Sequence, residues 1–248
     1  MTGKVKKSVA KRFRILLEQS AELTRKRVAG GGLEVGQEVL ARFQCNRLAA
    51  TYDDLRVQKR YTKAMDFFLT DLYGPLDFSQ RDDDIKRVYP IMVNVLSADA
   101  IESLAQGLEL NSLSMQLDAK LLHVLVGELG FDPQHEPDAL DFQMYADGYR
   151  LCDNYAERAR QIELIVELGE NLEAVTRKRL ILTAVKVARK PAQVAGFGEL
   201  QSFIERGLAA FKAMGSANEF LSTMHSRETR LLDSIFENKP IPKSIRVK

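Results

Sequence analysis

Histidine and cysteine are scarce in this chain of 248 residues, which holds three histidines and two cysteines. None of the histidines has a glutamate three residues before it, so the paired Glu-x-x-His motifs of helical di-iron proteins are absent. No Cys-x-x-Cys pattern occurs, which argues against a structural zinc site. We expect Cys45 and Cys152 to be buried free thiols, with a disulfide between them as the alternative. The sequence therefore predicts no metal and no cofactor.

Long hydrophobic runs and linker-like stretches are missing as well. No apolar run approaches the ~20 residues needed to cross a bilayer, and Ile15–Leu17 is too short for the core of a signal peptide. No Pro/Ser/Gly-rich linker divides the chain. We therefore expect a cytoplasmic protein with a basic N-terminal helix and glycine hinge at 1–32, a single helical domain at 33–237 and an extended basic tail at 238–248.

Strand-like alternation is absent, whereas helical periodicity runs through almost the whole chain. The pattern predicts an all-α, elongated multi-helix bundle of about seven to eight helices with two long central helices, over 33–73 and 97–129. Further helices are expected over 138–168, which Gly169 should end or bend, and over 172–190, which Pro191 should close. Ser97 should cap the helix over 97–129, and Ser216 and Glu219 form a capping-box pattern that should open the last helix.

The stretch over residues 67–90 contains both a helix stop and a helix start. Gly74 and Pro75 should end one helix, while Ser79 and the aspartates 82–84 should begin the next. Three polar residues here are candidate ligand-binding positions, namely Tyr73, Asp77 and Arg81. Consecutive aspartates on a helix point about 100° apart and do not converge on one cation. Helix capping and local ion pairs are the preferred interpretation.

Four phrases of the sequence resemble a family of uncharacterised bacterial helical proteins, namely FFLTDLYGPLDFSQRD, LELNSLSMQLD, RQIELIVELG and ARKPAQVAGFGELQSFIERGLAAFKAMG. The resemblance covers most of the chain after about residue 35. It implies a bacterial, cytosolic setting. It attaches no activity to the chain and transfers no site residue.

The net charge of +2 conceals an uneven distribution, because residues 1–28 hold nine Lys/Arg against two Glu and residues 237–248 hold four against one. Basic ends on an acidic body suit a phosphate-rich partner, a membrane surface or a docking protein, although solvation of the ends is the simpler interpretation. The candidate nucleic-acid or partner-binding residues are Lys6, Lys7, Lys11 and Arg12 near the N-terminus, and Arg179, Lys186 and Lys190 on one helical stripe.

Three functional hypotheses follow from these patterns. We expect first a non-catalytic helical scaffold or regulatory protein-interaction protein, whose partner is a protein, a second copy of the chain included. The first alternative is a pocket for a small ligand or haem, because His123 stands in an apolar helical run and would be an axial ligand, although a core histidine is the preferred interpretation. The third is a nucleic-acid-associated protein, which is less favoured because no helix-turn-helix pattern is present. We also expect residues 1–28 to be separable from folding.

Overall fold

The computed structural model describes residues 2–29, 33–72 and 79–241, and within these ranges the chain is all-α, with eleven α-helices and no strand. The elements are α1 (Thr2–Ala29), α2 (Leu33–Thr51), α3 (Asp53–Arg56), α4 (Thr62–Phe67), the π-helix η1 (Phe68–Leu72), α5 (Ser79–Val95), α6 (Ala98–Gly127), the 3-10 helix η2 (Pro137–Ala139), α7 (Phe142–Cys152), α8 (Tyr155–Thr176), α9 (Arg179–Val194), α10 (Gly198–Met214) and α11 (Asn218–Phe236).

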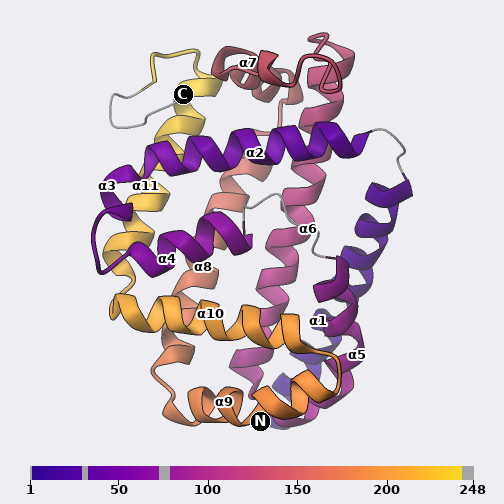
Figure 1. Cartoon of the computed structure of the whole chain (residues 1–248), viewed down its shortest axis with the longest axis vertical. Helices are drawn as coiled ribbons and strands as arrows, with labels where there is room; N and C mark the ends of the chain where they lie inside the picture. Colours follow the sequence, from indigo (N-terminus) through magenta and orange to yellow (C-terminus); the bar gives the residue numbers. More distant parts are fainter. Residues whose placement is uncertain (1, 30–32, 73–78, 242–248) are drawn as a thin grey trace.

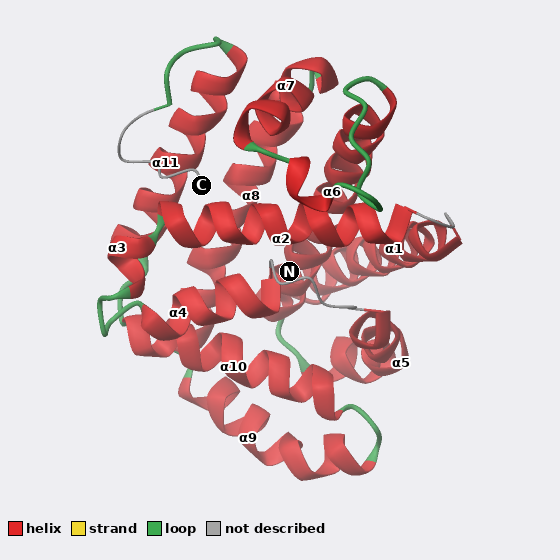
Figure 2. Ribbon diagram, turned by 45° about the horizontal axis from the view of Figure 1, so that its top comes forward, coloured by secondary structure: helices red, strands yellow, loops and turns green. Residues whose placement is uncertain are grey.

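The helices form two crossed layers (Figure 1). Four long helices, α1, α6, α8 and α11, run along the long axis of the molecule and pack side by side in that order. Helices α2, α4 and α10 lie across them (Figure 2), and α9 lies at one end of the molecule against α10 and α8. This arrangement buries one face of α2, α4 and α10 against the long helices and leaves α9 at the edge.

The number of helices exceeds the predicted seven to eight because two expected helices are divided. The long helix expected over 33–73 breaks at Tyr52 and again over residues 57–61, which gives α2, α3 and α4. The helix expected over 138–168 breaks after Cys152, where Asp153 adopts a left-handed conformation with φ 46°. A left-handed residue ends the helical hydrogen-bond ladder, so α7 and α8 are separate helices. Only α6, at 30 residues, is a long central helix as predicted.

Gly169 does not end a helix. It lies buried inside α8, where an added Cβ would come within 2.5 Å of Cδ2 of Leu221 on α11. The glycine is therefore required by the close approach of two helices rather than by a turn. Pro191 does not end α9 either, because the helix continues to Val194 before Gly196 turns with φ 83°.

The capping predictions have mixed outcomes. Ser97 caps α6, since its hydroxyl accepts a hydrogen bond from the backbone N–H of Ala100. The Ser216–Glu219 box does not form, because α11 begins at Asn218 with Ala217 at the N-cap, and the Glu219 carboxylate accepts a hydrogen bond of 2.6 Å from the hydroxyl of Tyr61. Gly74 and Pro75 lie outside the described residues, as does the side chain of Ser79, although α5 begins at Ser79.

Helix α1 is part of the core. Phe13 is 1 % exposed and Leu17 is 4 % exposed, and both belong to a hydrophobic cluster with Ile101, Ala105 and Leu108 of α6. This placement argues against the expectation that residues 1–28 are separable from folding, because their removal would expose the facing side of α6. The basic residues of α1 therefore surround an apolar stripe that packs like that of any other core helix.

Candidate binding surfaces

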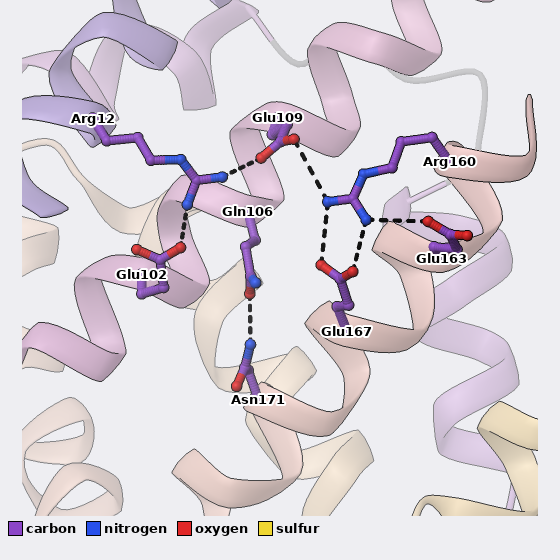
Figure 3. Close-up of polar contacts among 8 residues, drawn as sticks. All are labelled: Arg12, Glu102, Gln106, Glu109, Arg160, Glu163, Glu167 and Asn171. Carbon is purple, nitrogen blue, oxygen red and sulfur yellow. Dashed lines mark hydrogen bonds and ion pairs between the residues drawn. The ribbon is translucent and has the colours of Figure 1, made fainter. Parts of the chain in front are cut away.

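A polar cluster joins the three neighbouring long helices α1, α6 and α8 (Figure 3). Arg12 of α1 forms ion pairs with Glu102 and Glu109 of α6, and Arg160 of α8 lies 3.8 Å from Glu109. Arg160 also donates hydrogen bonds of 2.7 and 3.3 Å to the carboxylate of Glu167, which raise the pKa of the guanidinium. Gln106 accepts a hydrogen bond of 2.6 Å from Asn171 in the same cluster.

These contacts place the predicted partner-binding residue Arg12 between two helices. Its guanidinium is directed to α6 and divides its hydrogen bonds between two carboxylates that lie about two helical turns apart (Figure 3). Because both ends of its planar fork are used within the chain, Arg12 positions α1 on α6 instead of facing a ligand. The cluster therefore holds α1, α6 and α8 together by ion pairs and hydrogen bonds within the chain.

A second polar group is buried where α2 meets α11. Arg47 is 6 % exposed and donates hydrogen bonds of 3.1 and 2.8 Å to the two carboxylate oxygens of Glu228, which also accepts one of 2.8 Å from the hydroxyl of Tyr52. Although burial alone would lower it, the pKa of Arg47 is raised by Glu228 and by nearby tyrosines. Burial raises the pKa of Tyr52 well above its usual value, so this phenol stays neutral.

The buried polar group continues to a second arginine on α8. The guanidinium of Arg158 lies 4.3 Å from the ring centroid of Tyr149 and donates to the backbone carbonyl of Leu117 at 3.2 Å. It also lies 3.6 Å from Asp118, which accepts a hydrogen bond of 3.0 Å from Gln44. The positive charges of Arg47 and Arg158 are thus balanced by the carboxylates of Glu228 and Asp118. These contacts position α2, α6, α8 and α11 relative to one another and leave no net buried charge.

Neither cysteine is arranged for nucleophilic chemistry. Both are free thiols, and burial raises the pKa of Cys45 and of Cys152. A raised thiol pKa lowers the thiolate fraction at neutral pH. The Cys45 thiol donates a hydrogen bond of 3.4 Å to the carbonyl of Leu69. Among the residues that the structure describes, no group of His, Cys, Asp and Glu side chains is arranged to hold a metal ion.

Of the four candidate ligand-binding residues, the structure describes only the side chain of His123. Tyr73 and Asp77 lie outside the described residues, as does the side chain of Arg81. His123 is exposed on α6, although its neighbours Leu121, Leu122, Val124 and Leu125 are buried. The apolar run around it predicted a core or pocket histidine, but the helical turn directs this one position to solvent.

The basic residues of α1 separate into two groups. Lys6, Lys7 and Lys11 border a groove between α1 and α5, which Arg14 also lines, whereas Arg12 lies on the α6 side. The prediction therefore grouped side chains from two faces of one helix. Arg14 was not predicted, and a helical projection of the sequence would have found it, since it lies on the same face as Lys7 and Lys11.

The second predicted basic stripe lies on α9, and all three of its residues, Arg179, Lys186 and Lys190, are exposed. Beside it runs a stripe of apolar and small residues that also faces solvent. Leu180 is 87 % exposed, Val187 71 % and Val194 91 %, and exposed Ala184 and Pro191 lie between them. No residue of α9 is buried.

The orientation of α9 is fixed by contacts of its opposite side. The amide of Gln201 on α10 donates a hydrogen bond of 2.6 Å to the backbone carbonyl of Val185, and Arg189 donates one of 2.8 Å to Glu205. Lys178, just before the helix, forms an ion pair of 2.7 Å with Asp99 of α6. These contacts turn Ile181 and Val185, which are partly buried, toward the molecule and the stripe of Leu180 away from it.

The exposed apolar stripe of α9 is a feature that the helix predicted over 172–190 does not by itself reveal. Two signals could have indicated it. Residues 180, 184, 187, 191 and 194 follow the alternating four- and three-residue spacing of a coiled-coil seam. In addition, residues 174–198 contain six Lys/Arg and no Asp or Glu.

Comparison with known proteins gives one match. A family model described as a domain of unknown function, DUF8198, matches residues 25–242, which confirms the resemblance to an uncharacterised family. No curated protein and no solved structure matches the chain. Within the described residues, no helix combines the length and the apolar character that crossing a membrane requires.

Proposed function

The chain belongs to the family of the domain of unknown function DUF8198, and we propose that it is a non-catalytic interaction protein that binds a partner helix along α9. Since the family description states no activity, the proposal rests on the exposed stripe of Leu180, Val187 and Val194. Large aliphatic side chains aligned on a solvent-facing helix are costly unless a partner covers them, and such patches mark interaction sites. We call these residues, with Ala184 and Pro191, the α9 seam.

The shape of the α9 seam favours a helical partner. Its positions recur at alternating spacings of four and three residues, which is the narrow apolar seam by which two helices pair. From Leu180 to Val194 the seam extends about 21 Å at 1.5 Å per residue. A helix that lies in a lipid interface has a broader apolar face, commonly with aromatic side chains, and α9 has none of these.

The charge beside the α9 seam indicates an acidic partner. Arg179, Lys186 and Lys190 form the flank of the seam, and residues 174–198 contain no acidic side chain. Residues that flank a helical seam choose the partner through complementary charge. A second copy of α9 would bring no carboxylate to this flank, so we propose an acidic amphipathic helix of another protein.

The test uses a labelled helical peptide of about four heptads with Leu at the seam positions and Glu at the flanks. Mutual repulsion of its Glu flanks keeps this peptide from pairing with itself. Fluorescence anisotropy should show saturable binding to the full chain, with an affinity that falls as salt rises. The double variant Leu180→Ser/Val187→Ser should weaken binding at least tenfold.

The matched control is Val57→Ser/Ile91→Ser, which removes two aliphatic side chains that are 78 % and 60 % exposed elsewhere on the surface. It should bind like the wild type, and both double variants should keep the wild-type melting temperature within a few degrees, because all four positions are exposed. Equal binding by the α9 variant and the wild type would contradict the proposal. Binding to anionic vesicles without binding to the peptide would contradict it too and would indicate a lipid surface instead.

A further inference from the structure

A groove of about 500 Å³ lies between α1 and α5 and is separate from the α9 seam. Four of its lining residues are the cations Lys6, Lys7, Lys11 and Arg14 of α1, and Tyr89 and Asn94 line the α5 side. None of the residues that line it is acidic. Arg14 forms an exposed ion pair of 3.9 Å with Glu18, four residues later on α1. The groove is therefore strongly positive.

The groove has a defined wall. The hydroxyl of Tyr89 donates a hydrogen bond of 2.9 Å to the carbonyl of Ala10, and its ring packs at 5.4 Å between centroids against the core residue Phe13. At the end of α5, Lys6 Nζ donates to the carbonyl of Asn94 at 3.3 Å. These contacts join α5 to α1, so the four cations border a groove whose wall is formed by the packing of the two helices.

The cations of α1 are divided by role. Arg12 is directed to the carboxylates of α6, where it fastens the helix (Figure 3). The cations on the groove side take no part in these ion pairs between α1 and α6, and Lys7 and Lys11 are exposed. Lys6 and Arg14 have partners within the chain. Lys7 and Lys11, in contrast, are exposed like charges four positions apart that repel each other. An anionic ligand in the groove would relieve this repulsion.

We propose that this groove binds the backbone of a single-stranded nucleic acid. From Lys6 to Arg14 the cations extend about 12 Å along α1. Phosphates recur along a stacked strand about every 3.4 Å, so this length accommodates about three or four phosphates. A single strand enters a concave groove between two helices, whereas a duplex is a broad convex rod. Positively charged grooves that follow the backbone are usual sites for single strands, and Tyr89, whose ring packs against Phe13, forms part of the wall of this groove.

A lipid surface fits this groove less well than a single strand does. A bilayer surface is flat, so it reaches the side chains at the rim of a groove and leaves the wall around Tyr89 uncovered. Binding to lipid also draws on protruding apolar side chains. The apolar lining residues Ala10 and Val93 are, respectively, buried and partly buried.

The test measures binding of labelled oligo(dT) and oligo(rU), each of about 12 nucleotides, to the full chain by fluorescence anisotropy at several salt concentrations. With four phosphate contacts, the logarithm of the affinity should fall with the logarithm of salt with a slope of about −2.8. Lys7→Glu/Lys11→Glu should weaken binding at least tenfold at low salt and reduce the slope by about half. The control Lys63→Glu/Lys212→Glu reverses two exposed lysines on α4 and α10 and should weaken binding less than twofold.

Three results would overturn this proposal. The first is absence of saturable binding at low salt. The second concerns the loss of oligonucleotide binding in Lys7→Glu/Lys11→Glu. An equal loss in the control variant would show that binding follows net charge, and a larger loss in Lys186→Glu/Lys190→Glu would show that it follows α9. The third is binding to vesicles of phosphatidylglycerol and phosphatidylcholine that depends on Lys7 and Lys11 while oligonucleotide binding does not. The Leu180→Ser/Val187→Ser variant should bind the oligonucleotides normally, which separates this proposal from that for α9.

Discussion

At the scale of single residues, Arg47 and Glu228 make the most consequential polar contact between α2 and α11. Both side chains are largely withdrawn from solvent, with exposures of 7 % and 14 %. Burying two charges costs about as much as their attraction returns, but removing only one partner leaves the other charge unpaired. The intact pair therefore adds little net stability, but it disfavours any packing of α2 on α11 that would separate the two charges.

We predict that Arg47→Met lowers the free energy of unfolding by about 3–5 kcal/mol, because it leaves the Glu228 carboxylate buried with Tyr52 alone. The double variant Arg47→Met/Glu228→Leu should recover most of this loss. Urea denaturation of the wild type, both single variants and the double variant measures the coupling. Strictly additive losses would show that the two side chains do not depend on each other.

Tyr52 gives the same site a dependence on alkaline pH. Its pKa is raised in the folded protein, chiefly by burial, so the folded state favours the neutral phenol. The stabilisation is complete below the unfolded-state pKa of ~10 and is lost as the pH rises above that value, because only the unfolded state then ionises readily. Tyr52→Phe should cost about 1 kcal/mol at neutral pH and should make stability fall less between pH 9 and 11. Denaturation midpoints measured between pH 9 and 11 test this prediction. If stability falls with pH equally steeply in Tyr52→Phe and in the wild type, the prediction is wrong.

At the scale of elements, the close contact of α8 with α11 depends on Gly169. Gly169→Ala should destabilise the protein by about 1–3 kcal/mol, because the new methyl group would overlap the side chain of Leu221. Gly107 of α6 is the matched control, since nothing lies within 4 Å of a Cβ added there. Gly107→Ala should stabilise the protein by about 0.5–1 kcal/mol through helix propensity. Thermal melts that shift in the same direction for both variants would contradict this account.

The same elements show which parts of the fold the sequence determines locally. The periodicity was sufficient to predict an all-α chain, the long helix α6 and its Ser97 cap, because these depend on neighbours three and four residues away. Gly169 was misinterpreted because the reason for it is Leu221, 52 positions later in the chain. The break at Asp153 depends on a residue that is compatible with either a helix or a left-handed turn. Whether such a residue continues a helix or ends it depends on contacts with elements that are distant in the sequence.

The residues of the candidate surfaces were also predictable from the sequence only in part. Six of the seven predicted basic residues lie on the two proposed surfaces, since charge is directly readable from the sequence. The outward direction of the α9 seam could not be read, because it depends on which side of α9 contacts Gln201 and Glu205 of α10. Arg12 shows the converse, because only the position of α6 reveals that its charge is used within the fold.

At the scale of the whole molecule, α1 belongs to the folding unit although it carries most of the positive charge at one end of the chain. Phe13→Ala should cost about 3–5 kcal/mol, because this ring is 1 % exposed and packs against Tyr89. Ile15→Ala, at a position that is 42 % exposed, should cost less than about 1 kcal/mol. Equal and small losses in chemical denaturation would show that α1 is dispensable for folding.

The two proposed surfaces occupy different parts of this molecule. The groove is formed by α1 and α5, whereas α9 rests on α10 and α8. A protein that binds a helix at one surface and an anionic chain at the other brings two partners together, which is the action of a scaffold. Between them, the contacts of Arg12 and Arg160 with Glu109 join α1 to α6 and α8, and α9 rests on α8 and α10.

The most direct test of the interaction function is a charge exchange along the flank of the α9 seam. The wild type should bind the Glu-flanked peptide at least tenfold more tightly than a matched peptide with Lys in place of Glu. Lys186→Glu/Lys190→Glu should reverse this preference without changing the melting temperature, because both lysines are exposed. Binding that is insensitive to the sign of the flank, or that is lost for both peptides in the variant, would contradict the assignment of α9 as the docking helix.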